Sequence, residues 1–316
     1  TARLYRTERS MIDDFNKRAI DGLGGLNPEY SAELTIAHRL IALSLPRYYA
    51  IFFNPTAHLA LKEKEVRRAL TDAIDRKKII SAVFGGYATA ITGPLPPSVF
   101  NHASNNGGSV RTPQDSALAL EGAGWLMNPD DGVRYKTIST QRVALSFTVV
   151  IPDIPFLTKT MESVKKDWAG LGVKVIPQVY PIDEVAKEPL KNRKYDMIIF
   201  GNVLKNNPDI FAFWHSSQKF YPGLNLALYT NKEVDALLEE VRQEMDTEKR
   251  QARLEILYTT LINDAPAIFL FNPTYLYAAP RHLRGFTTAP ITTPAERFAH
   301  VNEWHVKTKR VFTRDR

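Results

Sequence analysis

Apolar and charged residues alternate with helical spacing at the start of the stretch Val66–Ser98. The apolar positions recur every three or four residues, which is typical of a helix with one buried stripe. Gly85 and Gly86 provide a helix end without steric cost, and the prolines that follow prevent another helix from starting. The pattern therefore predicts one amphipathic helix and then a Gly/Pro-rich exit. The apolar stripe consists of Val66, Ala69, Leu70, Ala73, Ile74 and Ile80.

A regular alternation of strands and helices begins at Val143. Apolar residues first alternate with polar ones, as in a strand, and then recur every three or four residues, as in a helix. The two patterns then follow one another again. Pro177 predicts that the second strand lies at an edge or a bend. The predicted elements are a strand at 143–149, a helix at 157–171, a strand at 173–179, a helix at 183–191 and a strand at 195–200. This order indicates an α/β unit in which at least part of the sheet is parallel.

Two further strands are predicted on either side of this α/β body. Tyr48–Phe53 precedes it, and Ala267–Phe271 follows it after two helices, the first of which has Asn231 as its expected N-cap. If these strands pair, the chain enters and leaves the body through a two-stranded neck. We therefore expect residues 1–50 to be part of one lobe, 51–266 to be a complete α/β lobe, and 267–316 to be the return strand and the remainder of the first lobe.

The composition excludes several classes of function. The chain has 316 residues and a formal net charge of +7, from 41 Lys and Arg against 34 Asp and Glu. Part of this excess lies in a C-terminal tail with a single aromatic residue, Phe312, whereas a nucleic-acid surface needs interleaved aromatics. We therefore expect no nucleic-acid partner. Cysteine is absent, which excludes thiol catalysis, disulfides and thiolate metal sites.

Several short motifs carry more information than the composition. Residues 66–80 read VRRALTDAIDRKKII and follow YAIFFNP at 49–55. Further along the chain come SALALEGAGW, LNLALYTNKEVD, MDTEKRQARLEILY and DAPAIFLF, at 116–125, 224–235, 245–258 and 264–271. In these residues and in this order, the chain resembles the family 5 substrate-binding proteins of ABC transporters, which are the dipeptide, oligopeptide and nickel binders.

The resemblance implies a fold and a role. The fold is a two-lobed, type II periplasmic-binding-protein-like α/β structure (a venus flytrap), of which this chain resembles the C-terminal portion: one complete lobe, both hinge strands and part of the second lobe. The role is the solute-binding component of an ABC importer, which captures a peptide or another polar solute by lobe closure and delivers it to an inner-membrane permease. The implied location is the periplasm, or the cell exterior as a membrane-anchored lipoprotein.

The same resemblance implies partners and excludes cofactors. Family members are roughly twice this length, so an N-terminal portion of the protein is expected as a missing segment or as a separate polypeptide. No catalytic residue, cofactor or metal ion is implied.

The expected ligand-facing segment is Gly201–Trp214, because it follows a buried strand and ligands bind beyond the carboxyl ends of strands in open α/β sheets. Peptide-binding members of the family resemble G-W-x-x-D-x-x-D-P here. This chain departs from that pattern: an amide replaces the tryptophan, a lysine and two amides replace the carboxylates, and an aspartate follows the proline. The candidate residues are Asn202, Lys205, Asn206, Asn207 and Asp209.

These departures predict a different kind of ligand. Lys205 repels an ammonium group, which a carboxylate would attract, so a peptide with a free amine is disfavoured. Amides and a lysine suit a ligand with carbonyls, hydroxyls or a negative charge, such as a sugar, an opine or a modified peptide. Alternatively, Asn206, Asn207 and Pro208 only make a turn. Both interpretations stay open at this stage.

Further candidates rest on weaker signals. Trp214, His215, Asn225 and Tyr229 are candidates for ligand contacts, with packing and capping roles as the alternative. The hinge is predicted at Phe53, Asn54, Phe269 and Phe271, where the Asn54 amide is expected to secure the hinge.

A catalytic interpretation finds little support in the motifs. Ser163 and Lys166 match S-x-x-K, but the companion S-D-N and K-T-G elements are absent. The chain also lacks H-E-x-x-H, G-x-S-x-G, Walker A and G-x-G-x-x-G motifs. We therefore predict a binding protein and not an enzyme. The alternative is a sensor or chaperone-like interaction module on the same fold, with a hydrolase as a distant third.

Overall fold

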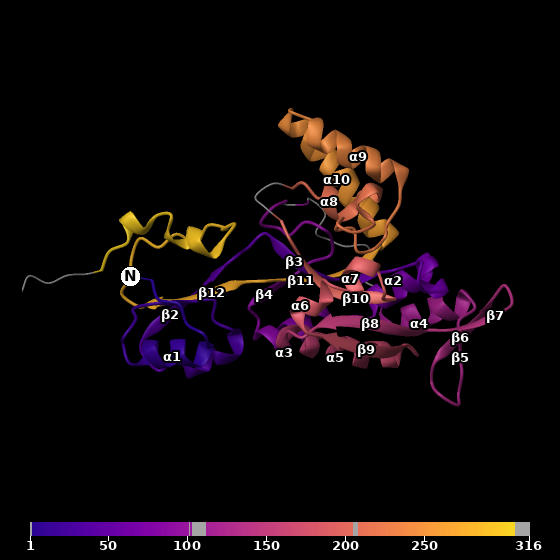
Figure 1. The fold of residues 1–316 in the computed structure, drawn as a ribbon, viewed down its shortest axis with the longest axis horizontal. Helices are drawn as coiled ribbons and strands as arrows, with labels where there is room; N and C mark the ends of the chain where they lie inside the picture. Colours follow the sequence, from indigo (N-terminus) through magenta and orange to yellow (C-terminus); the bar gives the residue numbers. More distant parts are fainter. Residues whose placement is uncertain (1, 101, 103–111, 205–207, 307–316) are drawn as a thin grey trace, which may run out of the picture. The chain divides into compact units, whose positions relative to one another are not determined.

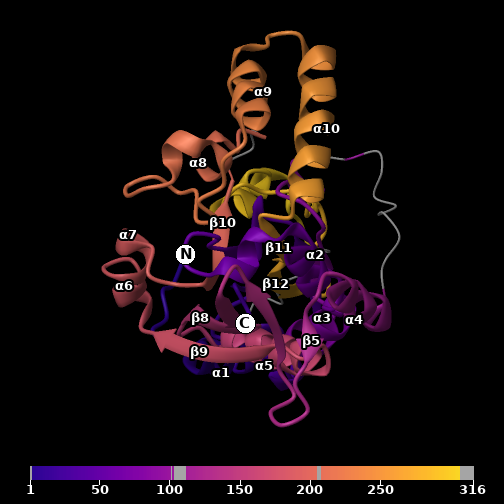
Figure 2. The ribbon, with the colours of Figure 1, turned by 90° about the vertical axis from the view of Figure 1, so that its right-hand side faces the viewer.

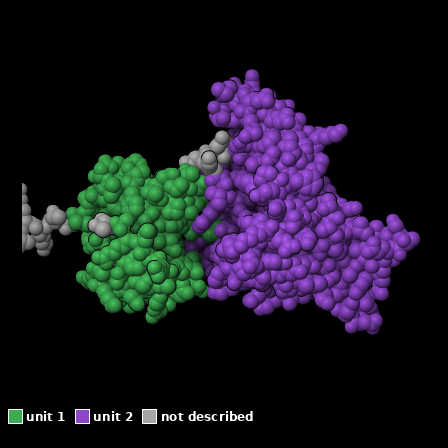
Figure 3. Space-filling model, in the orientation of Figure 1, with its two compact units in different colours: residues 1–46, 273–316 green, residues 47–272 purple. Residues whose placement is uncertain are grey.

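The computed structural model describes residues 2–100, 102, 112–204 and 208–306. The chain forms two compact units, which Figure 3 colours separately: residues 1–46 with 273–316, and residues 47–272. It passes from the smaller unit to the larger one at the start of β3 (Arg47–Phe53) and returns at the end of β11 (Ala267–Pro273). The lobe boundaries predicted at 50/51 and 266/267 fall inside β3 and at the start of β11, and the assignment of these units to lobes stays a prediction.

The larger unit contains a six-stranded sheet of order β4-β11-β3-β10-β8-β9 (Figure 1). Besides β3 and β11, its strands are β4 (Ala88–Ala90), β8 (Ser146–Pro152), β9 (Lys174–Tyr180) and β10 (Met197–Val203). Strand β8 is parallel to both of its neighbours, and β3 is antiparallel to both β10 and β11. The mixed sheet confirms the predicted α/β unit, the pairing of β3 with β11 and the edge position of the strand that contains Pro177.

Side chains of the sheet alternate between two cores, as the pleat of a strand requires. Ile51 and Phe53 of β3 belong to one core, whereas Ala50 and Phe52 belong to the other. The helices of the first core are α2 (Lys64–Asp72), α3 (Arg76–Phe84), α4 (Pro113–Gly122) and α5 (Pro155–Gly170). Those of the second core are α6 (Ile182–Val185), α8 (Phe211–Trp214), α9 (Lys232–Gln243) and α10 (Thr247–Asp264). In Figure 2, α9 and α10 stand on one side of the sheet, and α3 and α5 lie on the other.

The stretch predicted as a single helix from Val66 forms two helices instead. Helix α2 ends at Asp72, and the Asp75 carboxylate accepts a hydrogen bond from the Lys78 N–H at 3.0 Å at the start of α3. Aspartate is a preferred N-cap because it satisfies an N–H that has no intrahelical partner. Asp75 therefore starts a new helix. The predicted helix end is confirmed, because Gly85 takes a φ of +54° in the left-handed region.

Two other predicted elements are also divided. The strand predicted at 143–149 becomes β7 (Gln141–Ala144) and β8, because Leu145 between them donates its N–H to the Arg134 carbonyl and accepts from the Lys174 N–H. Strand β7 joins β5 (Leu126–Met127) and β6 (Arg134–Ile138) in a separate sheet. The helix predicted at 183–191 becomes α6 (Ile182–Val185) and α7 (Pro189–Asn192). Pro189 lacks an N–H and therefore starts a helix more readily than it continues one.

The smaller unit holds α1 (Glu8–Asn16) and a three-stranded sheet of order β1-β12-β2. These strands are β1 (Leu23–Gly24), β12 (Tyr275–Pro280) and β2 (His38–Leu43). Short 3₁₀ helices complete the described elements: η1 (Pro28–Glu33), η4 (Pro294–Phe298) and η5 (Val301–Glu303) here, and η2 (Leu59–Lys62) and η3 (Ser216–Gln218) in the larger unit. In the described part of the chain, no helix combines the length and apolar character needed to cross a membrane.

Candidate functional site

The order of the strands changes direction beside β8. The chain runs from β8 through α5 to β9 on one side, and then crosses back to β10 on the other side of β8. Ligands in open α/β sheets bind at such a switch point, beyond the carboxyl ends of the strands. The parallel strands on either side of the switch point are β8 and β10, and their carboxyl ends are Pro152 and Val203.

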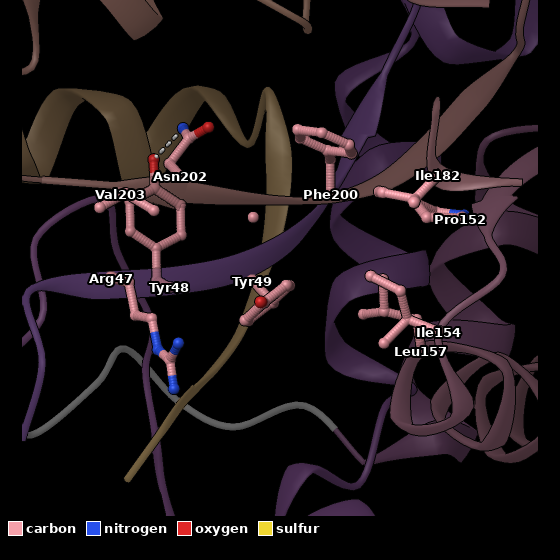
Figure 4. A pocket seen from close by; sticks show the side chains of 11 residues that line it. Arg47, Tyr48, Tyr49, Pro152, Ile154, Leu157, Ile182, Phe200, Asn202 and Val203 are labelled. Carbon is pink, nitrogen blue, oxygen red and sulfur yellow. Dashed lines mark hydrogen bonds between the residues drawn. The ribbon is translucent and has the colours of Figure 1, made fainter. Parts of the chain in front are cut away.

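A hollow of about 130 Å³ lies at this switch point (Figure 4). Its walls come from the start of β3, the ends of β8 and β10, and the first turns of α5 and α6. Figure 4 shows the Tyr49 and Phe200 rings opposite the aliphatic side chains of the α5 and α6 termini. The lining residues are Arg47, Tyr48, Tyr49, Pro152, Ile154, Leu157, Ile182, Phe200, Gly201, Asn202 and Val203. They all belong to the larger unit.

Gly201 determines the shape of the aromatic wall. It lies directly opposite Tyr49 in the register of β10 and β3. A Cβ atom at this position would come within 2.7 Å of the Tyr49 ring. The same ring lies edge-on to Phe156 at a centroid distance of 5.0 Å and beside Phe271 at 5.9 Å. The absence of a side chain at Gly201 therefore lets the Tyr49 ring lie over the backbone of β10.

Tyr48 and Asn202 form the polar part of the wall. The Asn202 Nδ2 donates a hydrogen bond to the Tyr48 hydroxyl at 2.8 Å, and both residues are buried. Burial raises the pKa of Tyr48 well above its ordinary value, and the hydrogen bond from Asn202 opposes this only in part. Tyr48 therefore stays a neutral phenol, and Asn202 keeps its carbonyl oxygen and a second amide hydrogen for other partners.

Arg47 supplies the cation of the site. It opens β3, pairs with Val203 in the register and lines the hollow. Its Nε atom is buried and has no hydrogen-bond partner among the described residues. Burial raises the pKa of Tyr49, and the positive charge of Arg47 opposes that shift. The guanidinium thus acts on the aromatic wall through its charge.

The structure places Asp209, Trp214 and His215 away from this hollow. The Asp209 carboxylate accepts from Arg242 Nε at 3.1 Å and from the Phe211 N–H at 3.0 Å. Trp214 is fully buried, and its ring lies near those of Phe52 and Phe269. His215 stacks on Phe211 at 4.1 Å and shares a 2.7 Å hydrogen bond with Ser217. These contacts assign packing and capping roles, and a role in ligand binding stays a prediction.

Asn225 and Tyr229 lie together in the same region of the larger unit. The Asn225 side chain donates to the backbone carbonyls of His215 and Tyr229 at 3.2 and 3.0 Å, and it accepts from the Tyr229 N–H at 3.1 Å. The Tyr229 hydroxyl donates to Asp264 at 2.5 Å. Neither residue lines the hollow. Lys205, Asn206 and Asn207 lie outside the described residues.

The predicted hinge residues divide between the two ends of their strands. Phe271 pairs with Tyr49 and Phe269 with Ala50, next to the point at which the chain passes between the units. Phe53 and Asn54 lie at the opposite end of β3. There the Asn54 amide donates to the carbonyls of Arg193 and Tyr195 at 3.1 and 2.9 Å, across to the start of β10. The hinge role of all four residues stays a prediction.

Of the individual candidate residues that the structure describes, Asn202 alone lines the hollow, beside Gly201 and Val203 of the expected ligand-facing segment. The sequence reasoning missed the contributions of Tyr48, Tyr49, Phe200 and the α5 and α6 termini. The available signal was Gly201, a glycine that follows a continuous apolar run. Among the described residues, no group of three or more His, Asp or Glu side chains is placed to hold a metal ion.

Comparison with known proteins identifies the family. The family model described as bacterial extracellular solute-binding proteins, family 5 Middle, matches residues 2–221. This chain belongs to that family. The family predicted from the motifs is thus confirmed.

Two curated relatives are each more than twice as long as the part that this chain matches. The oligopeptide-binding protein AppA of Bacillus subtilis (strain 168) is 28% identical over 257 residues, which cover 77% of this chain and 44% of that protein. Heme-binding protein A of Haemophilus influenzae is 26% identical over 241 residues, which cover 76% of this chain and 42% of that protein. The chain thus spans somewhat less than half of the length of these two relatives.

The fold agrees with a solved structure of an oligopeptide-binding protein. The structure of AppA from Bacillus subtilis in complex with a nonapeptide matches with a TM-score of 0.77 and 22% identity, over 96% of this chain and 60% of that chain. At this identity the likeness establishes the fold. The predicted type II periplasmic-binding-protein-like architecture, present in part, is therefore confirmed.

Proposed function

We propose that this chain is part of the solute-binding component of an ABC importer and that the hollow at the ends of β8 and β10 binds part of the solute. The observation that carries the proposal is the position of the hollow, which lies at the switch point of the sheet. Membership of the family of extracellular solute-binding proteins supports the same role. The implied partners are a solute and a membrane permease, and the implied location is the periplasm or the cell exterior.

The solute class is a peptide or another polar solute with an apolar group. AppA of Bacillus subtilis, named as oligopeptide-binding, and heme-binding protein A of Haemophilus influenzae bear the names of quite different ligands. The apolar walls of the hollow suit a side group, and the Asn202 amide suits a carbonyl or a hydroxyl at the edge.

The proposed role is reversible binding without chemical change of the solute. Tyr48 and Tyr229, two tyrosines with strongly raised pKa values, are engaged in structural hydrogen bonds with Asn202 and Asp264. Neither pair presents a free base or nucleophile to the hollow. These contacts favour a binding protein over the hydrolase alternative.

A binding screen with two matched glycine variants tests this proposal. Thermal-shift measurements with dipeptides, longer peptides and sugar acids would identify solutes that stabilise the chain. Gly201→Ala should abolish the shift, because its Cβ displaces the Tyr49 ring, whereas Gly170→Ala should retain it, because a Cβ there meets no atom within 4 Å. Equal binding by both variants would place the site elsewhere. Denaturing mass spectrometry should return the solute with unchanged mass, and a changed mass would contradict the binding role.

A further inference from the structure

Among the described residues, the lining of the hollow contains one cation and no carboxylate. Arg47 is the sole charged side chain among the lining residues that the structure describes. No ion pair joins Arg47 to any residue that the structure describes, and its buried Nε has no hydrogen-bond partner there. A partly buried cation without a counterion is unfavourable until an anion pairs with it. The charge of the hollow is therefore complementary to a negative group.

Helix α5 adds to this positive potential. It is 16 residues long, and its first turn contains no acidic residue. Ile154, its N-cap, and Leu157 in its first turn both line the hollow, so the positive end of the helix lies at the wall. The guanidinium and the helix end come from different segments of the chain. Both favour a negative charge at the same place.

The volume of the hollow limits the size of the apolar group that fits. An engineered apolar cavity of about 150 Å³ binds one benzene molecule. The present hollow, of about 130 Å³, is close to that size. Its walls are the Tyr49 and Phe200 rings and the side chains of Ile154, Leu157 and Ile182. A single ring or a branched aliphatic group of about six heavy atoms fits, whereas a larger group does not.

We propose, on the basis of the function proposed above, that the hollow selects a carboxylate-bearing solute with one compact apolar group. The carboxylate pairs with Arg47 at the start of β3, and the apolar group packs against the Tyr49 and Phe200 rings. A guanidinium offers two parallel N–H donors to a carboxylate, which favours this group over a neutral amide. An ammonium group at the same place meets Arg47 and the helix end and is rejected.

Three probes with one carbon skeleton test this selectivity on the full chain. They are 3-phenylpropanoate, 3-phenylpropanamide and 3-phenylpropylammonium, which differ in charge at one end. Methyl NMR of chain labelled at Ile, Leu and Val reports binding at the hollow through Ile154, Leu157 and Ile182. We expect the carboxylate to bind at least about tenfold more tightly than the amide, and the ammonium to bind more weakly than the amide.

Matched variants assign the selectivity to Arg47. Arg47→Gln should reduce carboxylate affinity at least about tenfold and remove the preference over the amide. Arg142→Gln removes an equal charge from β7, where the guanidinium lies over the Tyr135 ring, and should retain the preference. Gly201→Ala should weaken the binding of all three probes, whereas Gly170→Ala should not.

The outcomes separate this inference from the proposed function. Preferential carboxylate binding that depends on Arg47 supports both. If the probes shift the methyl signals of the hollow but the amide or the ammonium binds as tightly as the carboxylate or more tightly, the carboxylate inference is overturned. The hollow then remains a solute site. If no probe shifts these methyls at millimolar concentration, both the inference and the assignment of the solute site to this hollow fail.

Discussion

The Asn202 amide and the Tyr48 hydroxyl form a buried hydrogen bond of 2.8 Å across the β10–β3 pair. The two residues are direct partners in the strand register. Their side chains therefore join the strand that opens the larger unit to the strand that ends at the hollow. The sequence separation of 154 residues makes this a contact that only the folded chain contains.

Removal of the Tyr48 hydroxyl should destabilise the larger unit. Tyr48→Phe leaves the Asn202 amide buried without its partner, and we expect a loss of about 1–2 kcal/mol in the free energy of unfolding. Urea unfolding, followed by circular dichroism, measures this loss. Tyr180→Phe is the control, because the Tyr180 side chain makes no hydrogen bond that the structure describes. Equal losses in both variants would contradict a specific role for the Tyr48–Asn202 pair.

Arg134 should be essential for stability although it does not line the hollow. Its side chain is 3% exposed and donates to the carbonyls of Leu171 and Trp125, each at 2.9 Å. Arg134→Met preserves the apolar stem but leaves both carbonyls without this donor, so we expect a loss of about 2–4 kcal/mol. Arg134→Lys lacks the planar guanidinium that reaches both carbonyls, so it should recover little of the lost stability. Arg142→Met should change stability by less than about 0.5 kcal/mol, and a similar loss there would refute the argument.

Asp264 should make stability depend on pH in acid. Burial alone raises the pKa of Asp264, but hydrogen bonds from Tyr229 and Asn231, together with Lys64, lower it to a net value below the ordinary 3.8. The folded state therefore binds this proton less readily than the unfolded state. The resulting stabilisation is present above pH 3.8 and is lost as the pH falls through the folded-state pKa.

Asp264→Asn should therefore lose stability less steeply than the wild type between about pH 5 and pH 2. Urea unfolding at successive pH values gives the two slopes. Asp130→Asn, a substitution of an exposed aspartate, should keep the wild-type slope. Parallel curves for wild type and Asp264→Asn would show that Asp264 has the same pKa in both states.

Asn225→Ala should affect folding and leave the chemistry of the hollow unchanged. The substitution removes the side chain that binds the backbone of His215 and Tyr229, at a cost of about 2–3 kcal/mol. Asn192→Ala, at the exposed end of α7, serves as the control. When 3-phenylpropanoate is added to folded Asn225→Ala, the methyl signals of Ile154, Leu157 and Ile182 should shift as they do in the wild type. Normal stability with lost binding would instead support the ligand role predicted for Asn225 from the sequence.

Some features of the site could be predicted because they are recorded in local patterns. The run Tyr195–Phe200 indicates a buried strand, and binding beyond its carboxyl end leads to Asn202, which lines the hollow. Asp209, in contrast, does not line the hollow, and the reason is local. Asp209 has a cation and a backbone N–H within reach, and these contacts satisfy its carboxylate.

By itself, the sequence determined the class of element at most positions and the family, whereas the pairing of the strands on either side of the α/β body entered only as a condition. Periodicity records which side chains are buried, so it distinguishes a helix from a strand and a central strand from an edge. Family motifs record the order of those elements. Neither signal contains the distance between residues that are remote in the chain.

Only the tertiary structure decided the composition of the hollow. It brings together the start of β3, the ends of β8 and β10, and the first turns of α5 and α6, which are segments up to about 150 residues apart in the chain. The register that sets Tyr49 opposite Gly201 depends on both strands, and a shift of one residue would turn the ring to the other face. Arg47 acquires its place at an apolar wall for the same reason: strand pairing, and not local pattern, determines which side chains share a surface.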